Sequence, residues 1–277
     1  MMPRVARWLW SVVLLTACRT SASPPPPAAL EKAPVPLASP NGDPAQPSVV
    51  AEPDRPGFAV VELFTSEGCS SCPAADDVLA EIAATEQSRS VYALAFHVDY
   101  WDDLGWKDRF SSPASTERQH GYAASFRSRR VYTPQLVING TSEFTGSERA
   151  RARRVIDAAL ERAPSMTRLA LRLGRDDGRG VEVRYAVTGA PAGSVLHLAL
   201  VDREGTSVVA AGENAGRTLH HARVVRSFVT VDGAIDAGAR TLTRSESGAS
   251  DVIGYVQSRS PGPAGGLAIW AAARATR

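Results

Sequence analysis

Gly68-Cys69-Ser70-Ser71-Cys72-Pro73 is the stretch on which the prediction of the fold depends. An apolar run at 58–64, rich in β-branched and aromatic residues, precedes it and predicts a buried strand. Pro73 suits the first turn of a helix, and apolar residues recur on one helical face through about residue 86. The two cysteines are therefore expected where a strand gives way to a helix.

The segments that follow predict an α/β domain over residues 58–165. A second apolar run at 91–98 predicts another buried strand, so the helix between the two runs has the length of a crossover between parallel strands. Four more elements are expected downstream: a helix at 116–128, a strand at 134–138, a second strand paired with it through a turn at Asn139-Gly140, and a helix at 148–162. The order of elements is then β-α-β-α-β-β-α.

The pattern changes at about residue 167, where apolar and polar residues begin to alternate. Alternation with period two, interrupted by Gly and Asp-Gly turns, is typical of antiparallel sheets. The expected strands are 169–173, 181–187, 195–201, 224–231, 252–256 and 267–271. We therefore expect a C-terminal, β-sandwich-like domain over 166–277.

The N-terminus predicts export. Basic residues precede a short apolar run in residues 1–18, as in a signal peptide, and Leu15-Thr16-Ala17-Cys18 resembles the lipobox in which a cysteine is lipidated. An ordinary secretory signal is the alternative. Arg19, where inner-membrane lipoproteins usually carry aspartate, favours the outer membrane, on its periplasmic face. Residues 19–57 are rich in proline and poor in bulky apolar residues, which predicts a disordered tether.

The net charge of the chain bears on its possible partners, and its cysteine count bears on the role of each cysteine. The chain has 31 basic and 29 acidic residues, so its net charge of +2 does not call for a nucleic acid. Of its three cysteines, lipidation of Cys18 would leave a single C-x-x-C pair in an oxidising compartment. The expected membrane contact is the lipid anchor.

The C-x-x-C pair predicts thiol–disulfide exchange. Unpaired N–H groups at a helix N-terminus stabilise a thiolate, which makes Cys69 the expected nucleophile and Cys72 the resolving cysteine. Exchange with protein or small thiol substrates requires no cofactor. Two alternatives stay open: a structural disulfide, and a metal or partner site, for which His220-His221 is the one adjacent histidine pair.

Other residues are candidates for the same site. Thr133-Pro134, directly before a predicted strand, has the form of the cis-proline that lies beside the cysteine pair in thioredoxin-like proteins, where the residue before it offers its backbone to substrate. Glu62, on the strand entering the motif, is a candidate general base for Cys72, or else an edge or solvent-facing glutamate. Trp101 and Trp106, in the loop after the second strand, either line a substrate surface or pack that loop on the core.

Several stretches together resemble one known family. They are Val61–Pro73, His97–Asp102, Leu104–Asp108, Thr133-Pro134-Gln135, Gly212–Leu219 and Val224-Val225-Arg226. On these the chain, over about 58–277, resembles the exported thioredoxin-like family catalogued as domain of unknown function 1223. The resemblance implies a thioredoxin-like fold and the placement of the C-x-x-C motif, and it supplies no substrate.

Overall fold

A computed structural model describes residues 57–86, 88–163, 165–244 and 250–276, all within one compact unit. The predicted signal peptide, the tether and Cys18 lie outside the described residues. No helix in the described ranges is both long enough and apolar enough to cross a membrane.

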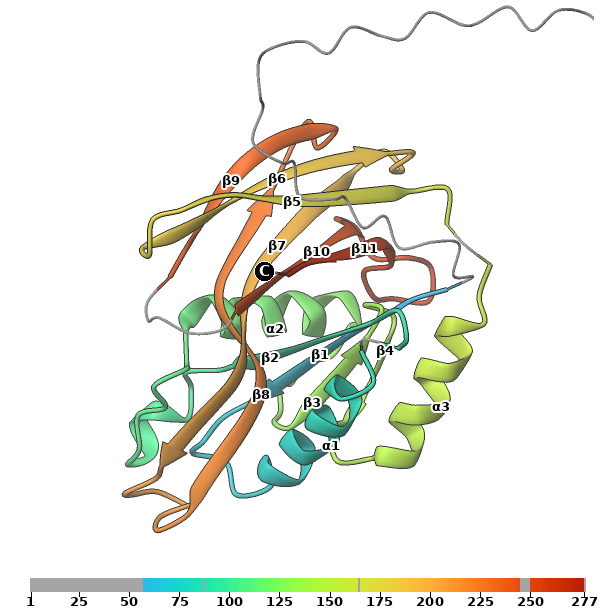
Figure 1. The fold of residues 1–277 in the computed structure, drawn as a ribbon. Coiled ribbons are helices and arrows are strands. Elements are labelled where there is room, and N and C mark those ends of the chain that lie inside the picture. The colour runs from blue at the N-terminus through green and yellow to red at the C-terminus, as the bar shows by residue number, and fades with distance from the viewer. Residues whose placement is uncertain (1–56, 87, 164, 245–249, 277) are drawn as a thin grey trace, which may run out of the picture. The chain divides into compact units, whose positions relative to one another are not determined.

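The described residues begin with a β1-α1-β2 unit and end in a run of strands (Figure 1). The α helices are α1 (Pro73–Ala83), α2 (Pro113–Ser125) and α3 (Arg149–Leu160), with a short 3-10 turn at Asp102–Leu104. The strands are β1 (Ala59–Thr65), β2 (Val91–His97), β3 (Gln135–Ile138), β4 (Ser142–Thr145), β5 (Arg168–Asp176), β6 (Gly180–Thr188), β7 (Ser194–Val208), β8 (Thr218–Val231), β9 (Ala237–Thr243), β10 (Ser250–Ser258) and β11 (Ile269–Ala275).

The central sheet is mixed, with the strand order β11-β10-β7-β8-β2-β1-β3-β4. Strands β1 and β2 run parallel, as expected for strands joined by a crossover helix. The β3–β4 hairpin turns at Asn139-Gly140, and both residues have positive φ angles, the backbone geometry for which Asn-Gly is favoured. Strand β8 continues the sheet on the other side of β2, in parallel contact at Ala95 and Val224.

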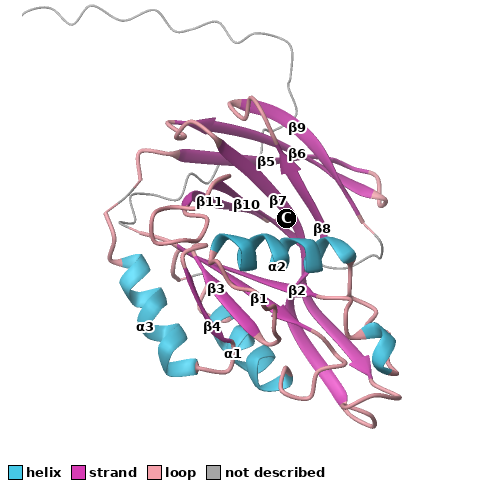
Figure 2. Cartoon of the chain, turned by 180° about the vertical axis from the view of Figure 1, so that it is seen from behind, coloured by secondary structure: helices cyan, strands magenta, loops and turns pink. Residues whose placement is uncertain are grey.

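Helices cover both faces of the β1–β4 part of this sheet (Figure 2). Alternate residues of β1 (Ala59, Val61 and Leu63) pack with helices α1 and α3. The residues between them, Val60 and Phe64, pack on the opposite face with Tyr122 of α2 and with residues of β10. Coverage on both faces explains why every residue of β1 and β2 is buried and why both strands read as continuous apolar runs.

A small antiparallel sheet, β5-β6-β9, packs against the β7–β10–β11 part of the central sheet. Alternate apolar residues of β6 face alternate apolar residues of β7 in one core cluster; they are Val181, Val183, Tyr185 and Val187 on β6, and Leu196, Leu198 and Leu200 on β7. When two sheets pack face to face, the alternate apolar residues of each strand point into the core between the sheets, as they do here.

The structure differs from the sequence-based expectation in three places. Strands β7, β8, β10 and β11 belong to the same sheet as β1–β4, so the parts predicted at 58–165 and 166–277 share one sheet. Strand β9 was not expected, because most of its residues are exposed and it has little apolar alternation. Helix α2 begins at Pro113, before the expected residue 116, because the Ser112 side chain accepts a hydrogen bond from the backbone N–H of Ser115 and caps it.

Candidate functional site

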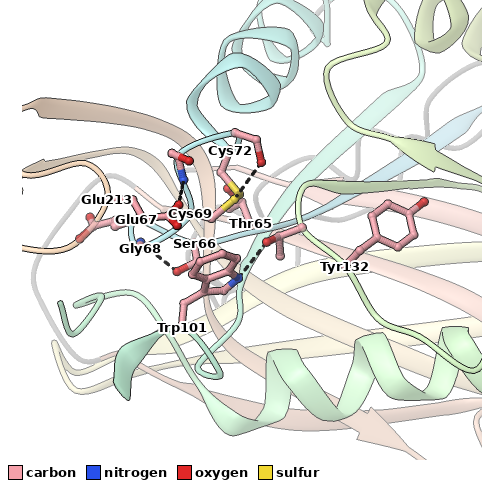
Figure 3. The surroundings of a disulfide bond; sticks show 12 residues. Thr65, Ser66, Glu67, Gly68, Cys69, Cys72, Trp101, Tyr132 and Glu213 are labelled. Carbon is pink, nitrogen blue, oxygen red and sulfur yellow. Dashed lines mark hydrogen bonds between the residues drawn. A yellow bond between two sulfur atoms is a disulfide. The ribbon is translucent and has the colours of Figure 1, made fainter. Parts of the chain in front are cut away.

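The cysteine pair forms a disulfide at the start of helix α1 (Figure 3). Cys72 is the N-cap residue and Pro73 follows it as the first helical residue. Both cysteines are buried, Cys69 with 1% of its surface exposed and Cys72 with none, whereas Ser70 and Ser71 between them are exposed. The Ser71 hydroxyl lies 3.3 Å from the Cys69 Sγ, close enough to donate a hydrogen bond to it.

Trp101 lies beside the cysteine loop and is hydrogen-bonded to Thr133, the residue before Pro134. The Trp101 indole N–H donates to the Thr133 hydroxyl at 2.9 Å, which links the loop after β2 to the segment before β3 (Figure 3). The Thr133–Pro134 peptide bond is cis. A Cβ atom at Gly68 would approach the Cβ of Trp101 to 3.1 Å, so the tryptophan side chain leaves little room for a larger residue before Cys69.

Trp106, the other candidate, contacts the cysteine loop at Glu67. Its indole N–H donates to a carboxylate oxygen of Glu67 at 2.7 Å, two residues before Cys69. Glu67 is completely buried. The structure therefore brings both tryptophans to the loop that carries the cysteines, where Trp106 makes a polar contact, while the polar contact of Trp101 is with Thr133.

A buried ionic cluster, which the sequence did not indicate, adjoins this loop through Glu67. Its members are Glu67 in the loop after β1, Asp76 on α1, His97 on β2, Asp108 in the loop before α2, and His221 on β8. His221 lies between two carboxylates, with Nε2 3.3 Å from Glu67 and Nδ1 3.5 Å from Asp76. His97 Nδ1 lies 2.6 Å from Asp108, and the two imidazole rings make an edge contact at 4.7 Å.

The cluster shifts the pKa values of its members. Burial alone lowers the pKa of His221, but Asp76 and Glu67 outweigh it and raise that pKa to about 9. Burial raises the pKa of Asp108, but the charge and hydrogen bond of His97 bring it down to about 2. The pKa of Glu67 is lowered in the same way: burial opposes the shift, and His221 drives it. At neutral pH the site thus holds an imidazolium at His221 beside the ionised carboxylate of Glu67.

The raised pKa of His221 predicts a pH-dependent stability. A pKa raised from 6.5 to about 9 stabilises the folded state fully below pH 6.5, and this contribution is lost as the pH rises through about 9. The loss corresponds to about 3 kcal/mol at most. Urea unfolding measured between pH 6 and pH 9 should show that the free energy of unfolding declines with rising pH in wild type and not in a His221→Gln variant.

His220 supplies the matched control for that experiment. It is adjacent to His221 but exposed, because successive side chains of a strand point to opposite faces, and its Nδ1 lies 3.2 Å from the Thr206 hydroxyl. A His220→Gln variant should keep the decline. An equal decline in His221→Gln and wild type would show that His221 does not carry it.

Glu62 does not reach the cysteine pair, which corrects its prediction as a general base for Cys72. It is buried, so the edge or solvent-facing alternative is wrong as well, and it points to the face of β1 opposite α1. There its carboxylate accepts hydrogen bonds from Arg118 at 2.6 Å, from Tyr255 at 2.8 Å and from Tyr122. Successive side chains of a strand point to opposite faces of the sheet. Because residues 61 and 63 face α1, the side chain of residue 62 faces away from it.

Two residues from the C-terminal half contact the cysteine loop directly. The Asn214 amide donates to the backbone oxygens of Glu67 and Cys69, at 2.8 and 2.9 Å, and the Glu213 carboxylate accepts from the backbone N–H of Ser70 at 2.8 Å. Both lie in the stretch 212–219, which the sequence singled out only for its resemblance. No local pattern indicates a partner about 145 residues away along the chain.

Among the described residues, no group of three or more His, Cys, Asp or Glu side chains is placed to hold a metal ion. The adjacent histidines do not act together, since His220 is exposed and His221 is buried. A pocket of about 240 Å³ lies between helices α1 and α3, apart from the cysteine loop. Its charged lining is already paired, for example Arg149 with Glu81.

A family model of proteins of unknown function, DUF1223, matches residues 60–257, which include the disulfide, the ionic cluster and the Glu213–Asn214 turn. The chain belongs to the DUF1223 family. This confirms the resemblance found in the sequence. No curated protein matches the chain.

Two solved structures are similar to this DUF1223 protein. One is the protein AGR_C_4864 from Agrobacterium tumefaciens, with 28% identity and a TM-score of 0.56, over 79% of this chain and 93% of that one. The other is HBP35 of Porphyromonas gingivalis, with 14% identity and a TM-score of 0.59, over 80% of this chain and 76% of that one. The second likeness concerns the fold alone.

Proposed function

We propose that this DUF1223 protein is an exported thiol–disulfide oxidoreductase with a thioredoxin-like α/β part. The observation that carries the proposal is the Cys69–Cys72 disulfide at the N-terminus of α1. Its surroundings support it, since Trp106 contacts Glu67 in the cysteine loop, and Trp101, beside Gly68, is hydrogen-bonded to Thr133. The β1-α1-β2 crossover followed by the antiparallel β3 and β4 is the arrangement expected of a thioredoxin-like part.

The proposed reaction needs only thiols and disulfides. A thiolate of a substrate dithiol attacks the Cys69 Sγ, the Cys69–Cys72 bond breaks, and a mixed disulfide forms while Cys72 leaves as thiolate. The second substrate thiolate then attacks the substrate sulfur of the mixed disulfide, which releases oxidised substrate and leaves both cysteines reduced. Run in reverse, the same steps reduce a substrate disulfide. Substrates are protein or small thiols.

The helix position gives Cys69 the role of nucleophile. The dipole at the start of α1 and the Ser71 hydroxyl, which can donate to a Cys69 thiolate, both lower a thiol pKa. Cys72 lies at the N-cap with no exposed surface, which suits the resolving cysteine.

The reduction potential of the Cys69–Cys72 couple tests the proposal. The full chain is equilibrated in graded thiol buffers, trapped and read by mass, with bound metal assayed on the same sample. A reversible two-electron transition between about −120 and −270 mV is expected, the range of known exchange catalysts. A potential below about −300 mV would identify a structural disulfide, and metal-protected cysteines would identify a chelating site.

We also propose that Cys18 is lipidated and anchors the protein at the periplasmic face of the outer membrane, with 19–57 as the tether. The support is the lipobox-like Leu15-Thr16-Ala17-Cys18 and the following Arg19. The mass of the mature N-terminal peptide tests this, because acyl chains on Cys18 are expected and an unmodified cleaved terminus would remove the anchor.

A further inference from the structure

The turn between β7 and β8, residues 209–217, reaches from the C-terminal half of the chain to the cysteine loop. The two strands pair as far as Val208 and Thr218, and the turn beyond them carries Glu213 and Asn214. Figure 3 shows Glu213 beside the loop that holds Cys69. The turn therefore contacts the backbone at Cys69 and at its neighbour Ser70. Groups at these positions influence the stability of a Cys69 thiolate.

The geometry of the turn is tightly specified. Gly212 and Gly216 flank the two polar residues, and both have positive φ angles that a side chain would disfavour. Arg217 donates to the Asn214 side-chain oxygen at 2.7 Å, which leaves the amide N–H₂ group directed at the backbone oxygens of Glu67 and Cys69. Asn214 is 1% exposed, so these bonds are shielded from water. Asn214 thus fixes the turn, and with it Glu213, on the cysteine loop.

Two polar side chains act on Cys69 in opposite senses. The Ser71 hydroxyl, 3.3 Å from Sγ, can donate a hydrogen bond to a thiolate and stabilise it. The Glu213 carboxylate accepts a hydrogen bond of 2.8 Å from the backbone N–H of Ser70, the residue next to Cys69. A negative charge near a thiolate disfavours it, and the occupied N–H is one donor fewer for the sulfur.

We propose that Glu213 is a positioning residue which disfavours the Cys69 thiolate and so lowers the reduction potential of the Cys69–Cys72 pair, with Asn214 holding it in place. The sign follows from the equilibrium: whatever stabilises the reduced form raises the potential, and whatever destabilises it lowers the potential. This rests on the proposed function, in which the pair cycles between its two forms, and it adds how the C-terminal half regulates that cycle.

Glu213→Gln in the full chain isolates the charge, because glutamine keeps an oxygen that can accept from Ser70 N–H. The equilibrium constant for reduction by glutathione should rise about threefold, which corresponds to about 15 mV at 30 mV per tenfold. The pKa of the Cys69 thiol should fall in the same variant. Glu213 is exposed, so 1 M salt should remove most of the difference from wild type.

Two controls fix the interpretation. Ser71→Ala should move the equilibrium in the opposite direction, and Glu182→Gln, at a partly exposed carboxylate on β6 paired with Arg184, should leave it unchanged. An unchanged or lowered equilibrium constant in Glu213→Gln, or a shift that 1 M salt leaves intact, would overturn the inference. The equilibrium exists for any disulfide, so a shift in a protein without exchange activity would sink the proposed function and leave this inference standing.

Discussion

Replacing Cys69 by serine is expected to reduce exchange activity by roughly 10³-fold or more, to the uncatalysed rate, because a hydroxyl cannot replace the thiolate nucleophile. Cys72→Ser should behave differently. Its Cys69 can still attack a disulfide, but no second thiol can resolve the mixed disulfide, so the covalent complex should accumulate. Mass spectrometry of each variant after incubation with a small disulfide reads out this asymmetry.

The burial of the pair makes this asymmetry informative. Cys69 and Cys72 are both almost inaccessible in the disulfide form, so exposure alone does not say which sulfur is attacked. Equal adduct formation by both variants would contradict the assignment of Cys69 as nucleophile. Unchanged turnover in Cys69→Ser would contradict a catalytic role for the pair altogether.

Replacing Arg118 by methionine is expected to lower the free energy of unfolding by about 3–5 kcal/mol, the usual cost of leaving one partner of a buried ion pair alone. Its guanidinium donates to Glu62, to the Tyr122 hydroxyl and to Gln257. It is also enclosed by aromatic rings at 4.8–5.5 Å, those of Phe96, Tyr122, Phe228 and Tyr255. The buried carboxylate of Glu62 would lose the cation that neutralises it.

A double variant shows whether the unpaired charge is the cause. Arg118→Met combined with Glu62→Gln removes both charges, so it should recover part of the stability lost in Arg118→Met alone. Urea unfolding of the wild type, the two single variants and the double variant gives the coupling energy. Because Glu62 faces away from α1, the potential of the Cys69–Cys72 couple should stay at the wild-type value in every variant that folds. Additive effects of the two substitutions would contradict a coupled pair.

The local elements of this protein were predictable from its sequence. The apolar runs at 58–64 and 91–98, the helical periodicity after Pro73 and the Asn-Gly turn each report on the few residues around them, and each corresponds to an element in the structure. The cysteine pair at a strand-to-helix junction followed from the same patterns, as did the two tryptophans in the next loop.

The sequence was least informative about the faces of elements and about distant partners. Glu62 was assigned to the cysteine pair from its proximity in sequence, but strand alternation turns it to the opposite face, toward Arg118. Charged residues such as Asp76, Asp108 and His221 look like ordinary surface residues in isolation. Only the packing of α1, β2 and β8 against one another makes them a buried cluster.

What the sequence by itself determined is therefore the cysteine pair, its helix and its membership of the DUF1223 family, because these depend on residues close together along the chain. The tertiary structure decided what surrounds the cysteine pair. Strand β8 joins the central sheet beside β2, and this one pairing brings His221, Glu213 and Asn214 to the cysteine loop. Sheet order is set by the burial of whole strands over long separations, and no local period in the sequence records it.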